Sequence, residues 1–532
     1  MTQQTTTQKI TSTGTYLDEI LSRLAAGGDT EAVVRGESRV TYAQAYERVL
    51  RLANALAQRG LRKGDGVAVF VGNRPESVLL QIAVHLLGCR LIFVPPEPGQ
   101  RELGAFIAQS GASVFVFDPG FGHRAAELAS GLTVRDVLSS GPSEVGTDLL
   151  ELAARAPAAL PGVEIGRDDI VTILYTGGTT GRSKLVTHRH LYYDVLIAAA
   201  GRRRGDSVGP QRFLVCTLVT HSSGHVAAIT GLLAGGTMVL ADGFDAGKVL
   251  ATIEQERITG MALTPPMLYE ILDHPACPER GFPTLSRIYY GSAPTAPARL
   301  EQAIERFGPV MRQSYGLTEA PVITILEPAE HDRGKPQTLR TCGRPLPGME
   351  VQVRDEEGNP VPVDQVGEVH VRGFMVMTEY WADPKRTREE LRDGWLRTGD
   401  LGYQDGDGYL YLVDRSKDVI VTGRTSDNVY SRLLDDFLAT VPGVRQAAAV
   451  GVPDDRYGEA VHVFVIPEPG VALDAAEITK RVVEELGELY EPQGITFVDT
   501  LPWTTMGKID KRALRTGFIH GNPSEAARVQ QT

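Results

Sequence analysis

Cysteine, tryptophan and positive charge are all scarce in this sequence. The 532 residues include four cysteines and three tryptophans, and the formal net charge is −12. The cysteines are Cys89, Cys216, Cys277 and Cys342. Their spacing fits neither a zinc site nor a disulfide framework. We therefore expect the protein to function in a reducing cytoplasm. The negative charge argues against nucleic acid or an anionic membrane surface as the main partner.

Long apolar runs and internal repeats are also lacking. No uninterrupted apolar stretch is long enough to span a membrane. Residues 1–14 are polar, without the apolar core of a signal peptide, and we expect them to be disordered. Hydrophobic residues make up 42% and charged residues 23%, which is typical of a globular protein. The length exceeds one ordinary core, so we expect two or more domains.

Helical and strand patterns alternate over the first part of the chain. Helices are expected over 17–24, from the cap Thr41 to Gly60, over 75–88 and over 101–111. Buried strands are expected over 67–71, 91–95, 113–117 and 169–174. Short strands buried on both faces and separated by helices predict an α/β fold built on mostly parallel sheets. The arginine-rich stretch 201–206 is expected to be a solvated loop.

The pattern changes twice towards the C-terminus. Residues 343–381 alternate between strand and turn, which predicts a β-rich subdomain over 342–414. Later strands at 446–452, 461–467 and 494–499 and a helix at 475–489 predict a small α+β unit. We therefore expect an N-terminal domain over 15–414, a hinge over 415–418, a C-terminal domain over 419–518 and a polar tail over 519–532.

One loop carries an unusual set of residues, LYTGGTTGRSKLVTH at 174–188. Its polar and flexible positions are Thr176, Gly177, Gly178, Thr179, Thr180, Gly181 and Lys184. Glycines let backbone N–H groups approach an anion, and hydroxyl groups and a lysine complete a site for polyphosphate. A Walker loop requires Gly-Lys-[Ser/Thr], whereas Gly181 is followed by Arg182, so the spacing excludes it. A plain glycine-rich turn stays open as an alternative.

Further motifs follow the loop in a recognisable order. They are YYGSAP (289–294), SYGLTEA (314–320), DGWLRTGDLG (393–402), DRSKD (414–418) and LPWTTMGKIDKRAL (501–514). Together with YTGGTTGRSK, they resemble the acyl-adenylate-forming (ANL) superfamily of ATP-dependent carboxylate ligases, which includes acyl- and aryl-CoA synthetases, adenylation domains and luciferases. The resemblance extends from the first expected helix to about residue 516. It implies a C-terminal domain that is mobile about the hinge.

The resemblance implies a reaction in two halves. A small carboxylic acid attacks the α-phosphate of ATP to give an acyl-adenylate and pyrophosphate, and a nucleophile then takes the acyl group and releases AMP. Glu319 resembles the family's Mg²⁺-binding glutamate, and Thr318 resembles a phosphate contact. A carboxylate oxygen is a ligand that Mg²⁺ favours. Without the motif, Glu319 would be interpreted as solvated surface.

Nucleotide contacts are implied at several further positions. Tyr315 resembles the ring that packs on adenine, with a core tyrosine as the alternative. Asp400 resembles the carboxylate that accepts both ribose hydroxyls, a task that suits its two oxygens. Arg415 resembles a second ribose or phosphate contact. The remaining nucleotide-binding residues implied by the resemblance are Gly291, Ser292, Ala293, Pro294 and Gly316.

Three lysines near the C-terminus receive different interpretations. Lys417 matches the residue about which the C-terminal domain turns, with a flexible exposed lysine as the alternative. Lys508 matches the catalytic lysine that bridges the carboxylate and the phosphate as they react. An ammonium group can stabilise negative charge that shifts during the attack. Lys511 is expected at the surface.

An acyl pocket is implied around His221, which resembles the family's gate and is a candidate catalytic residue together with Lys508 and Lys184. A structural histidine is the alternative for His221. The expected pocket residues are His221, Ser222, Tyr290, Gly316, Val322 and Ile323. They suit an apolar, cyclic or aromatic acid, whose identity the sequence leaves open.

The segment VTGRTSDNVYSRLLDDFL (421–438) departs from the family pattern. Arg424 and Thr425 add bulk where a glycine-rich turn would line the channel for coenzyme A. Ser431 replaces a proline, and Leu433 replaces a glutamate. We therefore favour slightly an amino-acid amine as acyl acceptor, as in stand-alone amide synthetases such as coronafacic acid ligase. Coenzyme A stays open as the acceptor, and harmless surface drift stays open as the cause of the departure.

Two functions of other classes can be weighed against the ligase. A non-catalytic nucleotide-binding module would bind ATP without turnover, and a Walker-type phosphotransferase would release ADP. The first is disfavoured because the candidate site residues Thr176, Lys184, Glu319, Asp400 and Lys508 are all retained. The second is disfavoured by the loop spacing. The oligomeric state is not indicated by the sequence.

Overall fold

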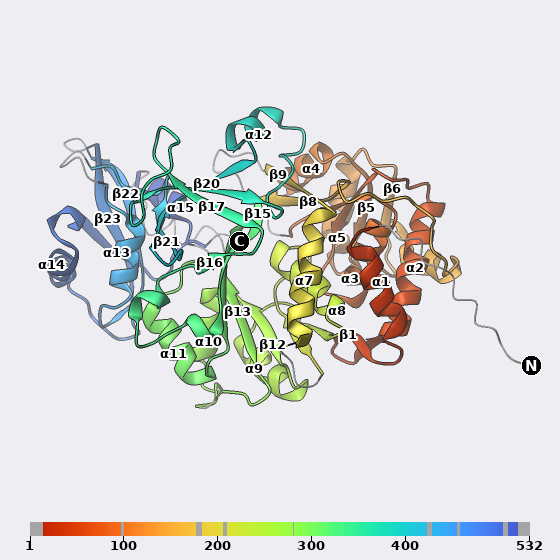
Figure 1. Cartoon of the computed structure of the whole chain (residues 1–532), viewed down its shortest axis with the longest axis horizontal. Coiled ribbons are helices and arrows are strands. Elements are labelled where there is room, and N and C mark those ends of the chain that lie inside the picture. Colours follow the sequence, from red (N-terminus) through yellow and green to blue (C-terminus); the bar gives the residue numbers. More distant parts are fainter. Residues whose placement is uncertain are drawn as a thin grey trace, which may run out of the picture.

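The computed structural model describes residues 14–96, 100–176, 184–205, 210–279, 281–422, 428–454, 458–503 and 509–519. Within these residues the chain forms a large N-terminal part and a smaller C-terminal part, coloured blue in Figure 1. Sheets and covering helices make up both parts, so the prediction of an α/β fold with a large and a small unit is confirmed.

A seven-stranded sheet contains the strands that the apolar runs predict. Its order is β7 (Thr147–Asp148), β6 (Asp136–Ser139), β5 (Ala112–Phe117), β3 (Gly66–Phe70), β4 (Arg90–Phe93), β8 (Ile170–Thr176) and β9 (Lys184–Arg189). All neighbours are parallel except β8 and β9, which pair antiparallel at one edge. The sheet is therefore mostly parallel, as expected.

A nine-stranded sheet forms the second layer. Its order is β16 (Arg344–Pro345), β15 (Ala320–Leu326), β14 (Met311–Leu317), β13 (Arg287–Gly291), β12 (Gly260–Leu263), β10 (Arg212–Val215), β11 (Thr237–Leu240), β1 (Glu31–Arg35) and β2 (Ser38–Thr41). The central pairs are parallel, and antiparallel strands close both ends. The carboxyl ends of β13 and β14 carry the YYGSAP and SYGLTEA motifs.

Helices cover both faces of the two sheets. One hydrophobic core is shared by both sheets and by the helices that lie between them. These helices are α1 (Tyr16–Ala26), α2 (Tyr42–Gln58), α3 (Pro75–Leu86), α6 (Leu149–Arg155), α7 (Leu191–Gly205) and α8 (Ser222–Leu233). The outer face of the seven-stranded sheet packs on α4 (Gln100–Gln109) and α5 (Gly122–Gly131), and that of the nine-stranded sheet on α9 (Ala246–Gln255), α10 (Pro265–Asp273) and α11 (Pro297–Phe307). Val69 contacts the shared core and Phe70 the outer one, because side chains alternate along a strand.

Local sequence signals explain where α2 begins and why α7 is longer than expected. Thr41 caps α2 as expected: its hydroxyl accepts from the Gln44 N–H, and the Gln44 side chain accepts from the Thr41 N–H. The expected loop at 201–206 is wrong for its first five residues, because α7 continues to Gly205. Arginine and alanine are strong helix formers, and no proline interrupts this stretch.

The β-rich subdomain and the C-terminal unit complete the fold. The antiparallel sheet contains β17 (Met349–Arg354), β18 (Gly367–Gly373), β20 (Trp395–Gln404), β19 (Leu391–Arg392) and β21 (Leu410–Arg415), with α12 (Pro384–Glu390) before β19. The C-terminal sheet contains β22 (Val444–Asp454), β23 (Gly458–Pro467) and β24 (Gly494–Phe497), covered by α13 (Ser431–Leu438), α14 (Ala475–Leu486) and α15 (Lys511–Ile519). The DRSKD motif begins with the last two residues of β21 and continues into the segment that leads to the C-terminal unit.

Candidate active site

The loop expected to hold phosphate joins two antiparallel strands. Thr176 at the end of β8 lies opposite Lys184 at the start of β9. Residues 177–183 between them lie outside the described residues. This stretch contains the predicted contacts Gly177, Gly178, Thr179 and Thr180. A Walker loop leads from a strand into a helix, whereas this one leads into a strand, so topology argues against a Walker loop as spacing does.

Lys184 meets two residues that lie far along the chain. Its ammonium nitrogen is 3.5 Å from Glu319 Oε1 and 3.2 Å from the Tyr380 hydroxyl oxygen. The Tyr380 hydroxyl donates to the same Oε1 at 2.8 Å. Burial, followed by the charge of Glu319, raises the pKa of Tyr380 above its ordinary value. The phenol therefore keeps its proton and stays a donor to the carboxylate.

One extended stretch, residues 377–381, connects the two halves of this cluster; we call it the bridging segment. The Met377 N–H donates to the Glu319 carbonyl oxygen at 2.7 Å. The Trp381 N–H donates to the Leu185 carbonyl oxygen at 2.8 Å, next to Lys184 on β9. The bridging segment therefore fixes the turn at Glu319 relative to the strand that carries the loop lysine.

His188 supports the residue that precedes Glu319. Its Nε2 lies 3.0 Å from the Thr318 carbonyl oxygen, and the ring is buried on β9. Burial lowers the pKa of His188 to about 4, so the ring is neutral near pH 7. Sequence reasoning singled out neither His188 nor Tyr380. A single sequence shows that a histidine follows the loop lysine, but it does not show that the histidine contacts Thr318.

The expected adenine strip follows β13. Gly291 lies opposite Ser314, and a Cβ there would lie 2.3 Å from the Ser314 carbonyl oxygen, so the close strand pairing requires glycine. Ser292 has φ of 69°, a left-handed conformation that is uncommon outside glycine and often found at functional sites. Ala293 and Pro294 come next. Tyr315 follows Ser314 on β14, so strip and ring lie at neighbouring strand ends.

Tyr315, Asp400 and Arg415 come together from three separate motifs. The Tyr315 hydroxyl donates to Asp400 Oδ2 at 2.6 Å, and Arg415 Nε lies 2.5 Å from Asp400 Oδ1. Tyr315 and Asp400 are both buried. Burial, followed by the charge of Asp400, raises the pKa of Tyr315 well above its ordinary value. The side chains expected at adenine and ribose thus form one charged and hydrogen-bonded group.

Lys417, the expected hinge residue, lies among charges from both parts of the chain. Partial burial of its ammonium group lowers the pKa of Lys417. The charge of Lys184 also lowers this pKa, whereas the charge of Asp510 raises it. Electrostatic interaction of this kind requires proximity. Asp510, two residues after the expected catalytic lysine, and the loop lysine are therefore both near Lys417.

Lys508 itself falls within residues 504–508, which lie outside the described residues. The residues on either side of this stretch, Trp503 and Ile509, pair in an isolated antiparallel bridge. The two residues that flank the segment with Lys508 therefore lie side by side. Its assignment as the catalytic lysine stays a prediction.

Lys511 is not a surface residue, and that prediction is wrong. Its side chain is 17% exposed and lies 2.6 Å from Asp435 Oδ2. It also donates to the Ser431 hydroxyl at 2.7 Å, and Ser431 donates to Asp414 Oδ2 at 2.9 Å. Ser431 is fully buried, so its replacement of the family proline is not surface drift. The sequence could not reveal these contacts because the partners lie about 80 positions away.

The expected acyl gate, His221, precedes α8. Its Nδ1 accepts from the Ser223 N–H at 3.2 Å and caps the helix. Two buried amide side chains hold the chain just before it: Asn73 Oδ1 accepts from the Val219 N–H at 2.8 Å, and Gln81 donates to the Val219 carbonyl oxygen at 3.0 Å. Sequence reasoning missed Asn73 and Gln81. Ser222 begins α8.

The other expected pocket residues do not all lie on one side. Val322 on β15 packs against the core shared with α8. Its neighbour Ile323 is part of that core and is fully buried. Tyr290 lies in the outer core with α9–α11, and its hydroxyl is 2.8 Å from His331 Nε2. Its neighbour Tyr289 packs against the shared core instead. Because side chains alternate along β13, the structure does not bring Tyr290 together with Val322.

Gly316 lies near the end of β14, and Glu319 lies in the turn between β14 and β15. A Cβ at Gly316 would lie 2.3 Å from the Pro321 carbonyl oxygen, so this turn is too tight for a side chain there. Within the described residues, no group of three or more His, Cys, Asp or Glu side chains is arranged to hold a metal ion. Mg²⁺ that arrives with a nucleotide needs only one or two carboxylates besides the phosphates. The single carboxylate of Glu319 fits that mode of binding.

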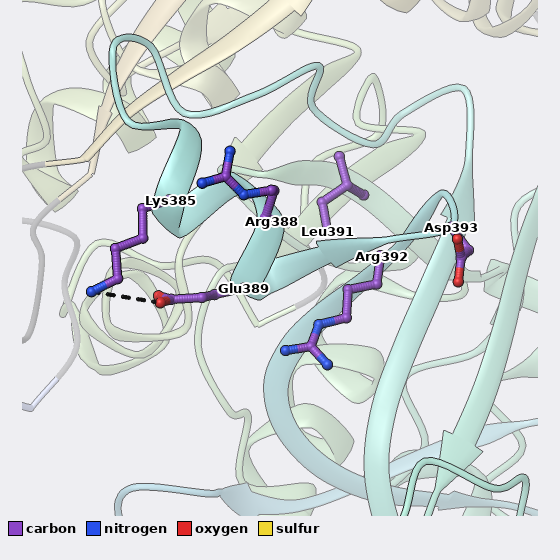
Figure 2. A pocket seen from close by; sticks show the side chains of 6 residues that line it. All are labelled: Lys385, Arg388, Glu389, Leu391, Arg392 and Asp393. Atoms are coloured by element: carbon purple, nitrogen blue, oxygen red, sulfur yellow. Dashed lines mark ion pairs between the residues drawn. The ribbon is translucent and has the colours of Figure 1, made fainter.

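A surface depression lies apart from these residues. Figure 2 shows its lining side chains, which come from α12, β19 and the residue after it. They are Lys385, Arg388, Glu389, Leu391, Arg392 and Asp393. The charges are of both signs, and Lys385 is 4.0 Å from Glu389. None of the predicted site residues that the structure describes lines this depression.

Two family models match most of the chain. The model for AMP-binding enzymes matches residues 22–381, and the model for the AMP-binding enzyme C-terminal domain matches residues 434–508. The chain therefore belongs to the AMP-binding enzymes of the ANL superfamily, which its motifs predict. It is an ATP-dependent acyl-adenylate-forming ligase. Within the described residues, no helix has the length and apolar character needed to cross a membrane.

Its relatives use different acyl acceptors. The chain is 36% identical over 503 residues to the medium/long-chain-fatty-acid–CoA ligase FadD8 of Mycobacterium tuberculosis, covering 91% of this chain and 87% of FadD8. It is 37% identical to the amide bond synthetase McbA from Marinactinospora thermotolerans, whose structure matches with a TM-score of 0.86 over 94% of this chain and 100% of McbA. Overall identity therefore does not decide the acceptor.

A third relative bears on the arrangement of the two parts. MatB from Rhodopseudomonas palustris matches with a TM-score of 0.85 in its ATP-bound structure (29% identity) and 0.75 in its apo structure (30% identity). Both comparisons cover 94% of this chain and 98% of MatB. The arrangement of the chain is therefore closer to that of ATP-bound MatB.

Proposed function

We propose that this chain joins an apolar carboxylic acid to an amine through an acyl-adenylate, which makes it an amide synthetase. The acid's carboxylate attacks the α-phosphate of ATP, and pyrophosphate leaves. The amine then attacks the acyl carbon, loses a proton, and AMP leaves. An amino acid supplies the amine. The apolar side chains of the shared core, against which Val322 packs, support an apolar acid.

The first half-reaction brings two anions together, so positive charge must screen them. Lys184 and Lys508 supply that charge, and the loop 177–183 supplies hydroxyl and N–H donors. Tyr315 packs on the adenine ring, while Asp400 accepts the ribose hydroxyls beside Arg415. Glu319 would hold Mg²⁺, which would add further neutralisation when bound. The cluster of Lys184, Glu319 and Tyr380 is the observation that most supports the proposed adenylation step.

The second half-reaction follows a turn of the C-terminal unit about Lys417, which withdraws Lys508. The departure within residues 421–438, at Arg424 and Thr425, is the sequence observation that favours an amine; these two residues lie outside the described residues. Arginine and threonine replace glycine in the turn that would line a pantetheine channel, and a small amine needs no such channel. The similarity to McbA, an amide bond synthetase, supports the same acceptor.

Transfer to coenzyme A is the second candidate, because FadD8 is a CoA ligase at nearly the same identity. Mass spectrometry separates the two. The enzyme receives ATP, Mg²⁺, mixed carboxylic acids, and coenzyme A together with an amino-acid pool. We expect amides and AMP as the main products. A thioester as main product would establish the second candidate, and ADP would contradict both.

The Asp400→Asn variant tests the ribose assignment. Asparagine keeps the shape but leaves Arg415 without its anionic partner and loses an acceptor for the ribose hydroxyls. We expect the KM for ATP to rise about 10- to 100-fold, from the roughly 1.5–3 kcal/mol of a hydrogen bond to a charged group. The KM for the acid should change little. Steady-state kinetics with the exposed Asp407→Asn as control would measure both, and an unchanged KM for ATP would reject the assignment.

A further inference from the structure

The loop lysine and the glutamate of the SYGLTEA motif do not form a simple ion pair. The direct distance from Lys184 Nζ to Glu319 Oε1 is 3.5 Å, whereas the Tyr380 hydroxyl oxygen is 3.2 Å from that nitrogen and 2.8 Å from that oxygen. Both charged groups therefore lie nearer to the phenol than to each other. The shared hydroxyl both accepts from the ammonium and donates to the carboxylate.

The two contacts leave one carboxylate oxygen open. Tyr380 and Lys184 both reach Oε1 of Glu319, and within the described parts of the chain no hydrogen bond or ion pair reaches Oε2. The Glu319 side chain is only 8% exposed. A buried carboxylate needs partners for its lone pairs. Oε2 is therefore the carboxylate oxygen at which an incoming cation would bind most favourably.

The phenol is also held rigidly. Tyr380 is 3% exposed, and its N–H donates to the Thr387 hydroxyl at 3.0 Å. It belongs to the bridging segment, which bonds to the Glu319 carbonyl on one side and to β9 on the other. The hydroxyl is consequently fixed relative to both charged side chains before any ligand arrives, and ligand binding does not have to order it.

We propose that Tyr380 is a positioning residue for the metal–nucleotide complex. Its hydroxyl holds Glu319 with Oε2 turned to receive Mg²⁺, and it keeps Lys184 close by without letting the lysine close onto the carboxylate. This inference rests on the proposed role of Glu319 as the Mg²⁺ ligand. Held in this way, Lys184 would stay free to bind the phosphates, and Glu319 would stay free to hold Mg²⁺.

Calorimetric titration with a non-hydrolysable ATP analogue, with and without Mg²⁺, tests the proposal without turnover. The measured quantity is the factor by which Mg²⁺ tightens binding of the analogue. Tyr380→Phe keeps the ring beneath the lysine and removes only the hydroxyl. We expect this factor to fall roughly tenfold, as for one hydrogen bond to a charged group. Binding of the metal-free analogue should be unchanged or tighter, because Lys184 is released.

Two further variants separate the possible outcomes. Tyr16→Phe removes another buried hydroxyl, bonded to His85 at 2.6 Å, and it should lower stability to urea without changing the Mg²⁺ factor. Glu319→Gln should abolish most of that factor. If Glu319→Gln abolishes it and Tyr380→Phe retains it, the positioning role is wrong. If Glu319→Gln retains it, the assigned metal ligand is wrong instead.

Discussion

The Lys508→Ala variant should lose acid-dependent ATP–pyrophosphate exchange by about 10²- to 10³-fold, the usual cost of removing one preorganised charge-stabilising group from a reaction centre. The lysine faces two like-charged reactants, and alanine leaves their repulsion unscreened at the moment of attack. Binding of ATP should weaken far less, because Tyr315, Asp400 and Arg415 remain. Isotope exchange with an accepted acid measures the effect.

The same variant also tests whether Lys508 acts in one half-reaction or in both. When the acyl-adenylate is supplied directly, transfer to the acceptor should stay within a few-fold of the unaltered enzyme, since Lys508 is expected to act only in the first step. Lys480→Ala, an exposed lysine on α14, is the matched control. Retained exchange in Lys508→Ala, or equal losses in both half-reactions, would falsify the assignment.

Local sequence signals predicted much of the fold. The apolar run at 67–71 became β3, and Thr41 caps α2, because burial on both faces and capping chemistry depend on neighbouring residues. Motif order likewise indicated that distant segments converge. Tyr315, Asp400 and Arg415 do meet, although 85 positions separate the first two.

Side-chain partners were harder to predict. The alternation along β13 places Tyr289 and Tyr290 on opposite faces, and the sequence does not say which face meets α8. Tyr380 and His188 act through partners on other elements, which no local pattern marks. Long-range pairing also explains the error at Lys511, since a lysine beside polar residues is usually exposed.

Lys511→Met should lower the stability of the C-terminal unit by about 1–3 kcal/mol, the usual cost of leaving a largely buried polar group without its partner. Methionine fills similar volume, and among the described residues it leaves the carboxylate of Asp435 with the Ala449 N–H, at 2.6 Å, as its remaining hydrogen-bond donor. Native-state hydrogen exchange on the amides of α13 and α15 measures the free energy of opening. Lys480→Met, from an exposed pair with Glu484, should change it by less than about 0.5 kcal/mol.

The loss should depend on pH, because burial raises the pKa of Asp435 to about 6 even though Lys511 opposes that shift. An aspartate whose folded pKa lies above its unfolded value keeps its proton longer in the folded state, so the cost of ionising it appears as the pH rises through that window. Removing Lys511 raises the pKa of Asp435 further, so the loss relative to the unaltered protein should be largest above pH 6 and should fade as the pH falls through 6. The double variant Lys511→Met/Asp435→Asn, which keeps an acceptor for Ala449 without a buried charge, should recover most of the stability. No recovery would mean that Lys511 acts through its packing or through Ser431, and not by neutralising Asp435.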